Sequence, residues 1–176
     1  EAPVLDPHIV SRSPLLELAA AADVPAIVAL RTEASNQLTS RHGPGPWSRG
    51  PTERGVDFER RSSALYVVRD GPAIMATLRL ATRKPWAIDL RYFTPVKRPL
   101  YLLALAVSTS RQLQGLGHAC LAAAVELARA QDAGAINLDA YDAPAGAGPF
   151  YEKCGFREVG RASYRGCPLR YYQRML

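Results

Sequence analysis

The sequence predicts an α/β domain, in which helices pack on a sheet of mixed strand direction. Short β-rich runs alternate along the chain with segments of helical periodicity. One run, residues 100–107, is almost wholly apolar, which is typical of a strand buried on both faces in the middle of a sheet. At 176 residues the chain has the length of one domain. We expect a single domain over residues 15–176, preceded by a poorly ordered lead-in over residues 1–14.

Composition and charge indicate which classes of molecule the protein can be expected to bind. Hydrophobic residues make up 48% of the chain and charged residues 22%, and no apolar run reaches the roughly 18 residues of a membrane helix. The net charge of +6 suits an acidic substrate or a phosphate-bearing cofactor. Because the basic residues are scattered and no nucleic-acid-binding motif is present, neither a nucleic acid nor a membrane is the expected partner.

The cysteines indicate a reducing environment. Cys120, Cys154 and Cys167 fit neither an even disulfide framework nor the close pairs of a zinc site. We therefore expect no metal and a cytoplasmic location. Cys120 lies on a helical stripe of apolar residues and is expected to pack in the core, and no histidine near the other two in the sequence marks them as nucleophiles.

The first third of the chain predicts a helix and a long loop. Residues 23–40 carry apolar side chains at helical spacing, with Asp23 placed to cap the helix. The preceding residues, 15–21, fit a strand and a helix equally well. Glycines and prolines then make residues 41–55 a loop. Trp47 in this loop either folds back over the core or forms a wall of an acceptor site.

The rest of the chain predicts alternating strands and helices. Two β-rich runs around Asp70-Gly71 are expected to form a hairpin. Apolar residues at positions 116, 120, 123 and 127 indicate one buried face of a helix. The expected elements from residue 100 onward are a buried strand over 100–107, a helix that carries the stripe 116–127 and stops near Gly134, a strand over 135–141, a short helix within 146–156, and strands over 157–164 and 169–176.

Two glycines precede the longest of these later helices. Gly115 and Gly117 follow a buried strand, and a glycine inside a helix costs roughly 0.5–1 kcal/mol relative to alanine. Glycines at a helix N-terminus let an anion approach unpaired backbone N–H groups, as in a phosphate-binding loop. The pattern is not that of nucleotide hydrolases, because His118 and Ala119 follow the second glycine. The dinucleotide-binding fingerprint fails as well, because it requires a glycine where Cys120 stands.

Residues 103–121, "LALAVSTSRQLQGLGHACL", resemble the acyl-CoA-binding motif of the GNAT superfamily of N-acetyltransferases. Residues 145–160, "AGAGPFYEKCGFREVG", resemble the second motif of the same superfamily, at a fitting separation. The first helix with its following Trp is similar to that of a broad GNAT subgroup. The resemblance implies a mixed, mostly antiparallel central sheet flanked by helices, acetyl-CoA as cosubstrate, and the homodimer that many relatives form as one open possibility.

The resemblance also implies which residues bind acetyl-CoA. The main chain of the buried strand is expected to pair with the pantetheine arm as an added strand would. The glycine segment is expected to bind the pyrophosphate through its backbone. The cofactor-binding residues implied are Leu105, Ala106, Val107, Gln112, Leu113, Gln114, Gly115, Leu116, Gly117, His118 and Ala119.

The chemistry requires a proton donor and a base. Tyr151 lies at the family's tyrosine position, where a phenol can protonate the departing thiolate; its alternative role is packing under the sheet. Many relatives use a Glu of the buried strand as base, but residues 100–107 contain no carboxylate. Asp139 is therefore the candidate base, because it points to the side of its strand opposite Leu138, and Asp142 and Glu33 remain alternatives. Pro144 replaces a common Asn, so that cofactor contact is lost.

The sequence therefore predicts an acetyltransferase that moves the acetyl group from acetyl-CoA directly to a primary amine. The acceptor, a small molecule or a peptide, stays open because it is chosen by variable loops. The missing strand carboxylate keeps a second hypothesis open. The chain would then be a GNAT-fold module that binds acyl-CoA or a protein partner without catalysis.

Overall fold

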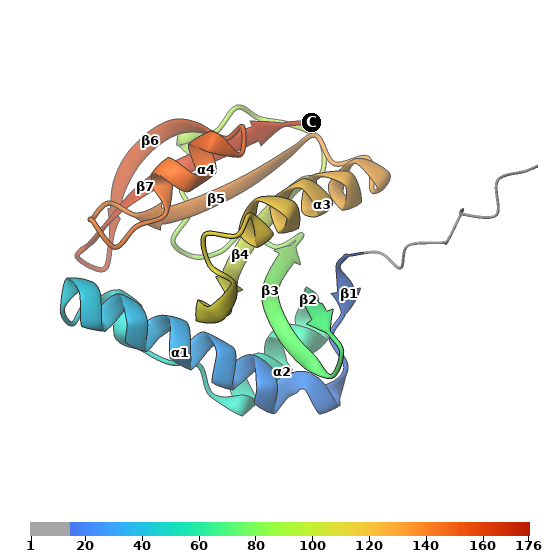
Figure 1. Ribbon diagram of the computed structural model, residues 1–176. Helices are drawn as coiled ribbons and strands as arrows, with labels where there is room; N and C mark the ends of the chain where they lie inside the picture. The colour runs from blue at the N-terminus through green and yellow to red at the C-terminus, as the bar shows by residue number, and fades with distance from the viewer. Residues whose placement is uncertain (1–14) are drawn as a thin grey trace, which may run out of the picture.

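The computed structural model describes residues 15–176, which form one seven-stranded sheet (Figure 1). The strands lie in the order β1-β2-β3-β4-β5-β7-β6, and only β4 and β5 are parallel neighbours. The predicted mixed, mostly antiparallel sheet is thus confirmed, whereas the expected lead-in over residues 1–14 lies outside the described residues. The strands are β1 (Glu17–Leu18), β2 (Ala64–Asp70), β3 (Ala73–Ala81), β4 (Pro99–Val107), β5 (Ala135–Tyr141), β6 (Arg157–Tyr164) and β7 (Cys167–Met175).

Helices cover both faces of this sheet. α3 (Leu116–Ala130) and α4 (Gly148–Lys153) pack on one face, while α1 (Val24–His42) and α2 (Glu53–Ser62) pack on the other face of β2 and β3. In Figure 1 α1 runs along the bottom of the molecule and α3 crosses in front of the sheet. No helix within residues 15–176 is both long and apolar enough to cross a membrane.

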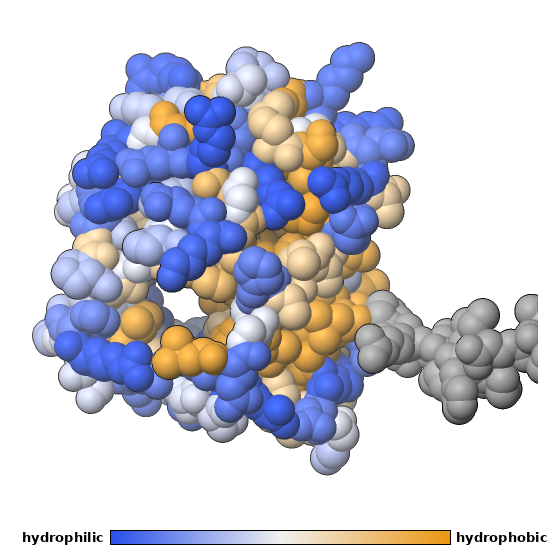
Figure 2. Space-filling model, turned by 45° about the horizontal axis from the view of Figure 1, so that its top comes forward, coloured by the Kyte–Doolittle hydropathy of each residue, from blue (hydrophilic) through white to orange (hydrophobic). Residues whose placement is uncertain are grey.

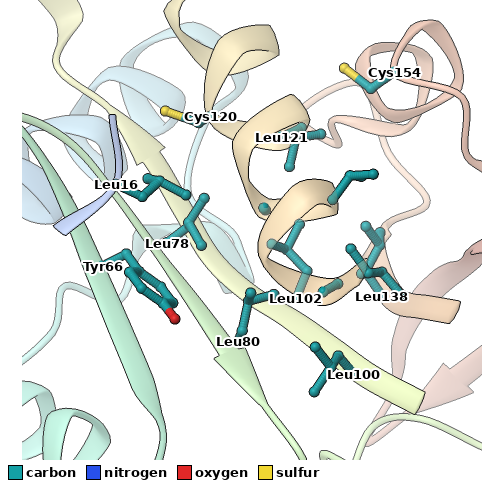
Figure 3. Packing of buried hydrophobic residues seen from close by; sticks show 14 of the residues in the cluster. Leu16, Tyr66, Leu78, Leu80, Leu100, Leu102, Cys120, Leu121, Leu138 and Cys154 are labelled. Carbon is teal, nitrogen blue, oxygen red and sulfur yellow. The ribbon is translucent and has the colours of Figure 1, made fainter. Parts of the chain in front are cut away.

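The largest hydrophobic cluster lies under α3 (Figure 3). Leu78, Leu102 and Leu138 reach it from β3, β4 and β5. As predicted, Cys120 packs in this core and is 1% exposed. The predicted stripe is offset, however, because the fully buried positions of the helix are Cys120, Leu121, Ala124, Val125 and Ala128, and residues 116, 123 and 127 pack only partly against the cluster.

The N-terminal part differs from the prediction in two ways. Asp23 stands at the N-cap of α1, yet its carboxylate makes no cap bond; it accepts from the Ala20 amide at 2.7 Å and from the Arg69 guanidinium instead. The predicted loop over residues 41–55 is interrupted by a short 3-10 turn, and its end already belongs to α2. α2 escaped prediction because it is strongly polar and buries only Val56.

The undecided segment before α1 contains both kinds of structure. β1 pairs with β2 over two residues, and a 3-10 turn, Ala21–Asp23, follows. Between β3 and β4 the chain runs over the sheet without a strand of its own, with a 3-10 turn at Leu90–Tyr92. Ile88 and Phe93 of this connection pack on Tyr171 and cover the half of the sheet that α1 and α2 leave open.

The two parallel strands in the middle of the sheet separate after a short contact. β4 and β5 pair only from Pro99 to Tyr101, opposite residues 135–137. Further along β4, Ala104 has a φ of +52° and forms a bulge that shifts the register with β3. Because a bulge bends its strand, the bulge turns the end of β4 away from β5. The sheet is therefore open between the ends of these strands.

Candidate active site

A cleft of about 680 Å³ lies at this opening, between α1, the end of β4, and the first turns of α3 and α4. Such a volume suits a sizeable ligand. Figure 2 shows a deep hollow at the left of its view, with hydrophobic and hydrophilic residues around it. The lining residues of the cleft are Ala34, Gln37, Leu38, Arg41, Leu105, Ala106, Val107, Gln112, Leu113, Gly115, Gly117, His118, Ala147, Phe150 and Lys153.

The two glycines of the cleft are needed for different physical reasons, one for its backbone conformation and the other for the space around it. Gly115 is the N-cap of α3 with a φ of +81°, a left-handed conformation that side chains disfavour, and a Cβ there would meet nothing within 4 Å. Gly117 has ordinary φ, but a Cβ would lie 3.2 Å from Phe150 Cζ and 3.7 Å from Val107 Cγ2. Gly115 thus shapes an open backbone loop, and Gly117 lets α4 approach α3.

The start of α3 offers free hydrogen-bond donors to the cleft. The first amides of any helix lack carbonyl partners within it, and no side chain caps α3. The first helical hydrogen bond joins the Ala119 amide to the Gly115 carbonyl. The amides of Leu116, Gly117 and His118 come before it and therefore have no hydrogen-bond partner within the helix. With the positive end of the helix dipole, these groups suit an anion such as a pyrophosphate.

The end of β4 offers a free backbone edge. On one side Ala106 and Val107 pair with β3, but on the side facing β5 no strand of the described chain pairs with residues 102–107. An extended ligand with amide groups can therefore pair there as an added strand. The Gln112 side chain donates to the Val107 carbonyl at 3.2 Å and holds the following loop against this strand end.

Most residues that the sequence implied for acetyl-CoA binding line this one cleft. Three of them do not contribute to its wall: Gln114 donates to the Ser110 carbonyl at 3.2 Å, Leu116 packs toward the core, and Ala119 is within the first turn of α3. His118 lines the cleft while its Nδ1 lies 3.4 Å from Cys154 Sγ.

Two cations of the cleft were missed by sequence reasoning. Arg41 comes from the end of α1 and Lys153 from α4. Lys153 stands within the second motif, so its place beside Tyr151 was a usable signal. Arg41 follows the predicted helix and carried no such signal. Both add positive charge where a phosphate-bearing ligand is expected.

Tyr151 is held by aromatic packing against the main hydrophobic cluster; it stands between Phe150 and Lys153 on α4 but is not itself among the residues that line the cleft. Its ring centroid lies 5.5 Å from that of Phe150, 5.8 Å from Phe156 and 6.1 Å from Tyr172. Burial, with a smaller contribution from the Asp139 charge, raises the pKa of Tyr151 above its ordinary value. The phenol therefore stays protonated and can act as a hydrogen-bond donor.

The three candidate bases differ in how they are paired. The Asp142 carboxylate accepts from Arg170 Nε at 2.7 Å and lies 3.8 Å from Arg161 Nη1. Glu33 is exposed on α1 and accepts from the Thr109 hydroxyl. Asp139 has neither a hydrogen-bond partner nor an ion pair within residues 15–176. Of the three carboxylates, it is the one left without a structural partner.

Asp139 lies on the sheet face opposite α3, as the alternation with Leu138 predicted. Leu138 belongs to the cluster under α3, whereas Asp139 stands opposite Tyr171, whose ring packs on the other face. Asp139 lines a second hollow of about 490 Å³. Burial raises the pKa of this carboxyl. A partly desolvated carboxylate with a raised pKa is suited to accept a proton.

Trp47 lies beside this second hollow. Its ring centroid is 5.7 Å from that of Tyr141 in an edge-on arrangement, and both side chains line an adjoining hollow of about 320 Å³. The indole N–H donates to the Gly43 carbonyl at 2.9 Å. Trp47 thus packs back on β5 through Tyr141 and also lines this adjoining hollow, so its role as a wall of an acceptor site stays a prediction.

The gap between β4 and β5, the unpaired amides of α3 and the titratable groups nearby suit a transferase that binds an acyl-CoA. The model of the acetyltransferase (GNAT) family matches residues 25–156. The chain belongs to this family, whose members are acetyl-CoA-dependent acyltransferases. The comparison with curated protein sequences gives no significant match.

Solved structures share the fold at low sequence identity. A ribosomal-protein-alanine N-acetyltransferase from Brucella melitensis is 18% identical with a TM-score of 0.66, covering 92% of this chain and 99% of its own. An N-acetyltransferase from Staphylococcus aureus Mu50 is 16% identical with a TM-score of 0.65, covering 91% and 96%. The yncA protein from Salmonella typhimurium, solved with its cofactor acetyl-CoA, is 18% identical with a TM-score of 0.64, covering 92% of both chains.

Proposed function

We propose that this protein transfers the acetyl group of acetyl-CoA directly to a primary amine. The parting of β4 and β5 is the observation that carries the proposal. The backbone-lined cleft and the hollow around Asp139 flank this gap. An amine that enters from the second hollow would reach a thioester held along β4, so both substrates would be bound at once.

The proposed chemistry assigns one proton to each side of the gap. An amine of pKa about 10.4 is neutral in only about one part in 2,500 at pH 7, so a base that removes its proton is valuable. We assign this role to Asp139, acting directly or through a water molecule. The amine nitrogen then forms a bond to the carbonyl carbon while the carbon–sulfur bond breaks.

Tyr151 is assigned to the departing sulfur. An ordinary tyrosine protonates a thiolate of pKa about 8.5 with a cost of about 2 kcal/mol. Because burial raises the pKa of Tyr151, complete proton transfer costs more than that. We therefore propose that the phenol acts chiefly as a hydrogen-bond donor that stabilises the thiolate as it leaves.

Two-substrate kinetics test the proposal. Release of free thiol is measured with a panel of primary amines while both concentrations are varied. Direct transfer predicts intersecting double-reciprocal lines, and mass spectrometry after incubation with acetyl-CoA alone should detect no acetylated protein. Binding of acetyl-CoA without thiol release from any amine would contradict the proposal and favour a non-catalytic module.

A further inference from the structure

The hollow around Asp139 carries charges of both signs. Its floor includes the Asp139 carboxylate of β5, and two arginines, Arg49 and Arg165, line it as well. These arginines come from the segment before α2 and from the β6–β7 turn. Much of the remaining wall is apolar or aromatic, with Ala87 and Leu169 among its residues.

The two arginines differ from their charged neighbours. Arg161 and Arg170, on the adjoining strands, each form ion pairs with both Asp142 and Glu158. Within the described residues neither Arg49 nor Arg165 has a carboxylate within 4.0 Å. The Arg165 guanidinium lies over the Tyr164 ring, 5.4 Å from its centroid. Two exposed guanidinium groups thus line the hollow without an ion pair to any described residue, and Asp139 lines the same hollow at more than 4.0 Å from either of them.

The backbone at Arg165 supports a role for its side chain. The β6–β7 hairpin turns through two residues, Arg165 and Gly166, with φ values of +50° and +77°. Such a turn favours Asn or Gly at its first position, because other side chains are strained there. An arginine at this position gives up local stability, and a function of its guanidinium in the hollow explains that cost.

We propose that the acceptor is a primary amine that also carries an anionic group, with a carboxylate as the reference case. The inference rests on the proposed function, because the amine must reach Asp139 to be acetylated. Arg49 and Arg165 would bind the anionic group, and a guanidinium matches the planar, two-oxygen geometry of a carboxylate. A hollow of about 490 Å³ holds a molecule of amino-acid or dipeptide size.

The test compares matched pairs of acceptors on the full chain. Each pair consists of an amino acid and its uncharged amide, and kcat/KM is measured by thiol release. It is compared per concentration of neutral amine, because amidation lowers the pKa of the neighbouring amine. A free amino acid and a short peptide with an acidic side chain next to its terminal amine distinguish the two sources of the carboxylate. We expect kcat/KM at least about tenfold higher for the carboxylate member of a pair.

Variants then assign the preference to the arginines. Arg165→Asn removes the charge and suits the turn, and Arg49→Gln removes the second charge. Each should lower the ratio of carboxylate to amide turnover about tenfold. Arg83→Gln is the matched control, because Arg83 is exposed, has no ion pair within residues 15–176 and does not line the hollow; it should leave the ratio unchanged.

The outcomes separate the inference from the proposed function. Equal or faster turnover of the amides by the wild-type protein overturns the inference alone. An equal fall of the ratio in Arg83→Gln also overturns it, because the preference would then follow from net charge. If acetyl-CoA binds but no amine of either kind releases thiol, the proposed function fails and the inference fails with it.

Discussion

The cleft and the Asp139 hollow lie at one gap in the sheet, but they are built differently. The cleft offers unpaired backbone groups, the free edge of β4 and the first amides of α3, together with the cationic side chains of Arg41 and Lys153. The hollow offers mainly side chains, with Asp139, Arg49 and Arg165 in a largely uncharged wall. A backbone site suits a ligand that is the same for every member of a family, whereas side chains can be exchanged to suit a particular acceptor.

Removing the Asp139 carboxylate from the hollow should have the largest effect and tests the difference between the hollow and the cleft. Asp139→Asn keeps the shape of the side chain and should lower kcat by about 100- to 1,000-fold, because the amine loses its base. Acetyl-CoA affinity should be unchanged. In the wild-type protein, activity should fall as the pH is lowered through the raised pKa of Asp139, and the variant should lack this acidic limb. Wild-type turnover by the variant would remove Asp139 from the mechanism.

The same substitution should stabilise the fold. Since burial raises the pKa of Asp139 in the folded state, the unfolded chain binds fewer protons at this group, and stability is lost as the pH rises from about 4 through the folded-state pKa. Asn carries no charge to desolvate. The melting temperature of Asp139→Asn should therefore exceed that of the wild type by roughly 2–5 °C at pH 7. The two should converge near pH 3.5, and a lower melting temperature at pH 7 would contradict the account.

Tyr151→Phe should have the next largest effect. The ring contacts with Phe150, Phe156 and Tyr172 remain, and the hydrogen-bond donor is lost. We expect kcat to fall about 10- to 100-fold, with little change in melting temperature or in KM for acetyl-CoA. Phe156→Leu disturbs the same packing without touching the donor and serves as a control. A fall in stability with full activity would show that Tyr151 only packs.

A negative charge introduced at Leu113 tests whether the cleft binds the phosphates of acetyl-CoA. This residue is fully exposed, lines the cleft and has a φ of +62°, which Asp and Asn tolerate better than most side chains. Leu113→Asp should weaken acetyl-CoA binding about tenfold by repelling its phosphates, and Leu113→Asn, of the same shape, should not. Calorimetric titration measures both dissociation constants. Equal affinities would place the phosphates elsewhere.

The smallest effect is expected from the glycine at the start of α3. Gly115→Ala should destabilise the fold by about 1 kcal/mol, because its φ of +81° is strained for alanine. Gly71→Ala, at a turn with a φ of +58° and equally open surroundings, should cost a similar amount and is the control. Only Gly115→Ala should also weaken acetyl-CoA binding. The same loss of affinity in both variants would show a general effect of stability.

Most residues that the sequence implied for acetyl-CoA lie around one cleft, and they could be found because their signals are contiguous. The apolar strand, the glycine segment and the second motif are each continuous stretches, so their patterns survive without knowledge of the fold. α2 was missed because it is short and strongly polar, buries only Val56, and follows directly on glycines and prolines that indicate a loop. Asp23 stands at the N-cap of α1 as predicted, but its carboxylate does not bond to the helix amides because it binds Arg69, which is distant in the sequence.

The hollow could be predicted only in part. The face on which Asp139 lies followed from strand alternation. Its advantage over Asp142 as a base could not be predicted, because it arises from the ion pair that Asp142 forms with Arg170 on the neighbouring strand. Arg49 and Arg165 come from loops far apart in the sequence, and only the folded chain brings them to Asp139. The acceptor side is thus the part of the site for which structure was needed.

The separation of the two sites is tested most directly by titrating acetyl-CoA into the wild-type protein, Asp139→Asn and Leu113→Asp. The account predicts that the wild type and Asp139→Asn bind with the same dissociation constant, while Leu113→Asp binds about tenfold more weakly. Loss of binding in Asp139→Asn, or undiminished binding in Leu113→Asp, would contradict the division between a backbone-built cleft for acetyl-CoA and a side-chain-built hollow for the acceptor.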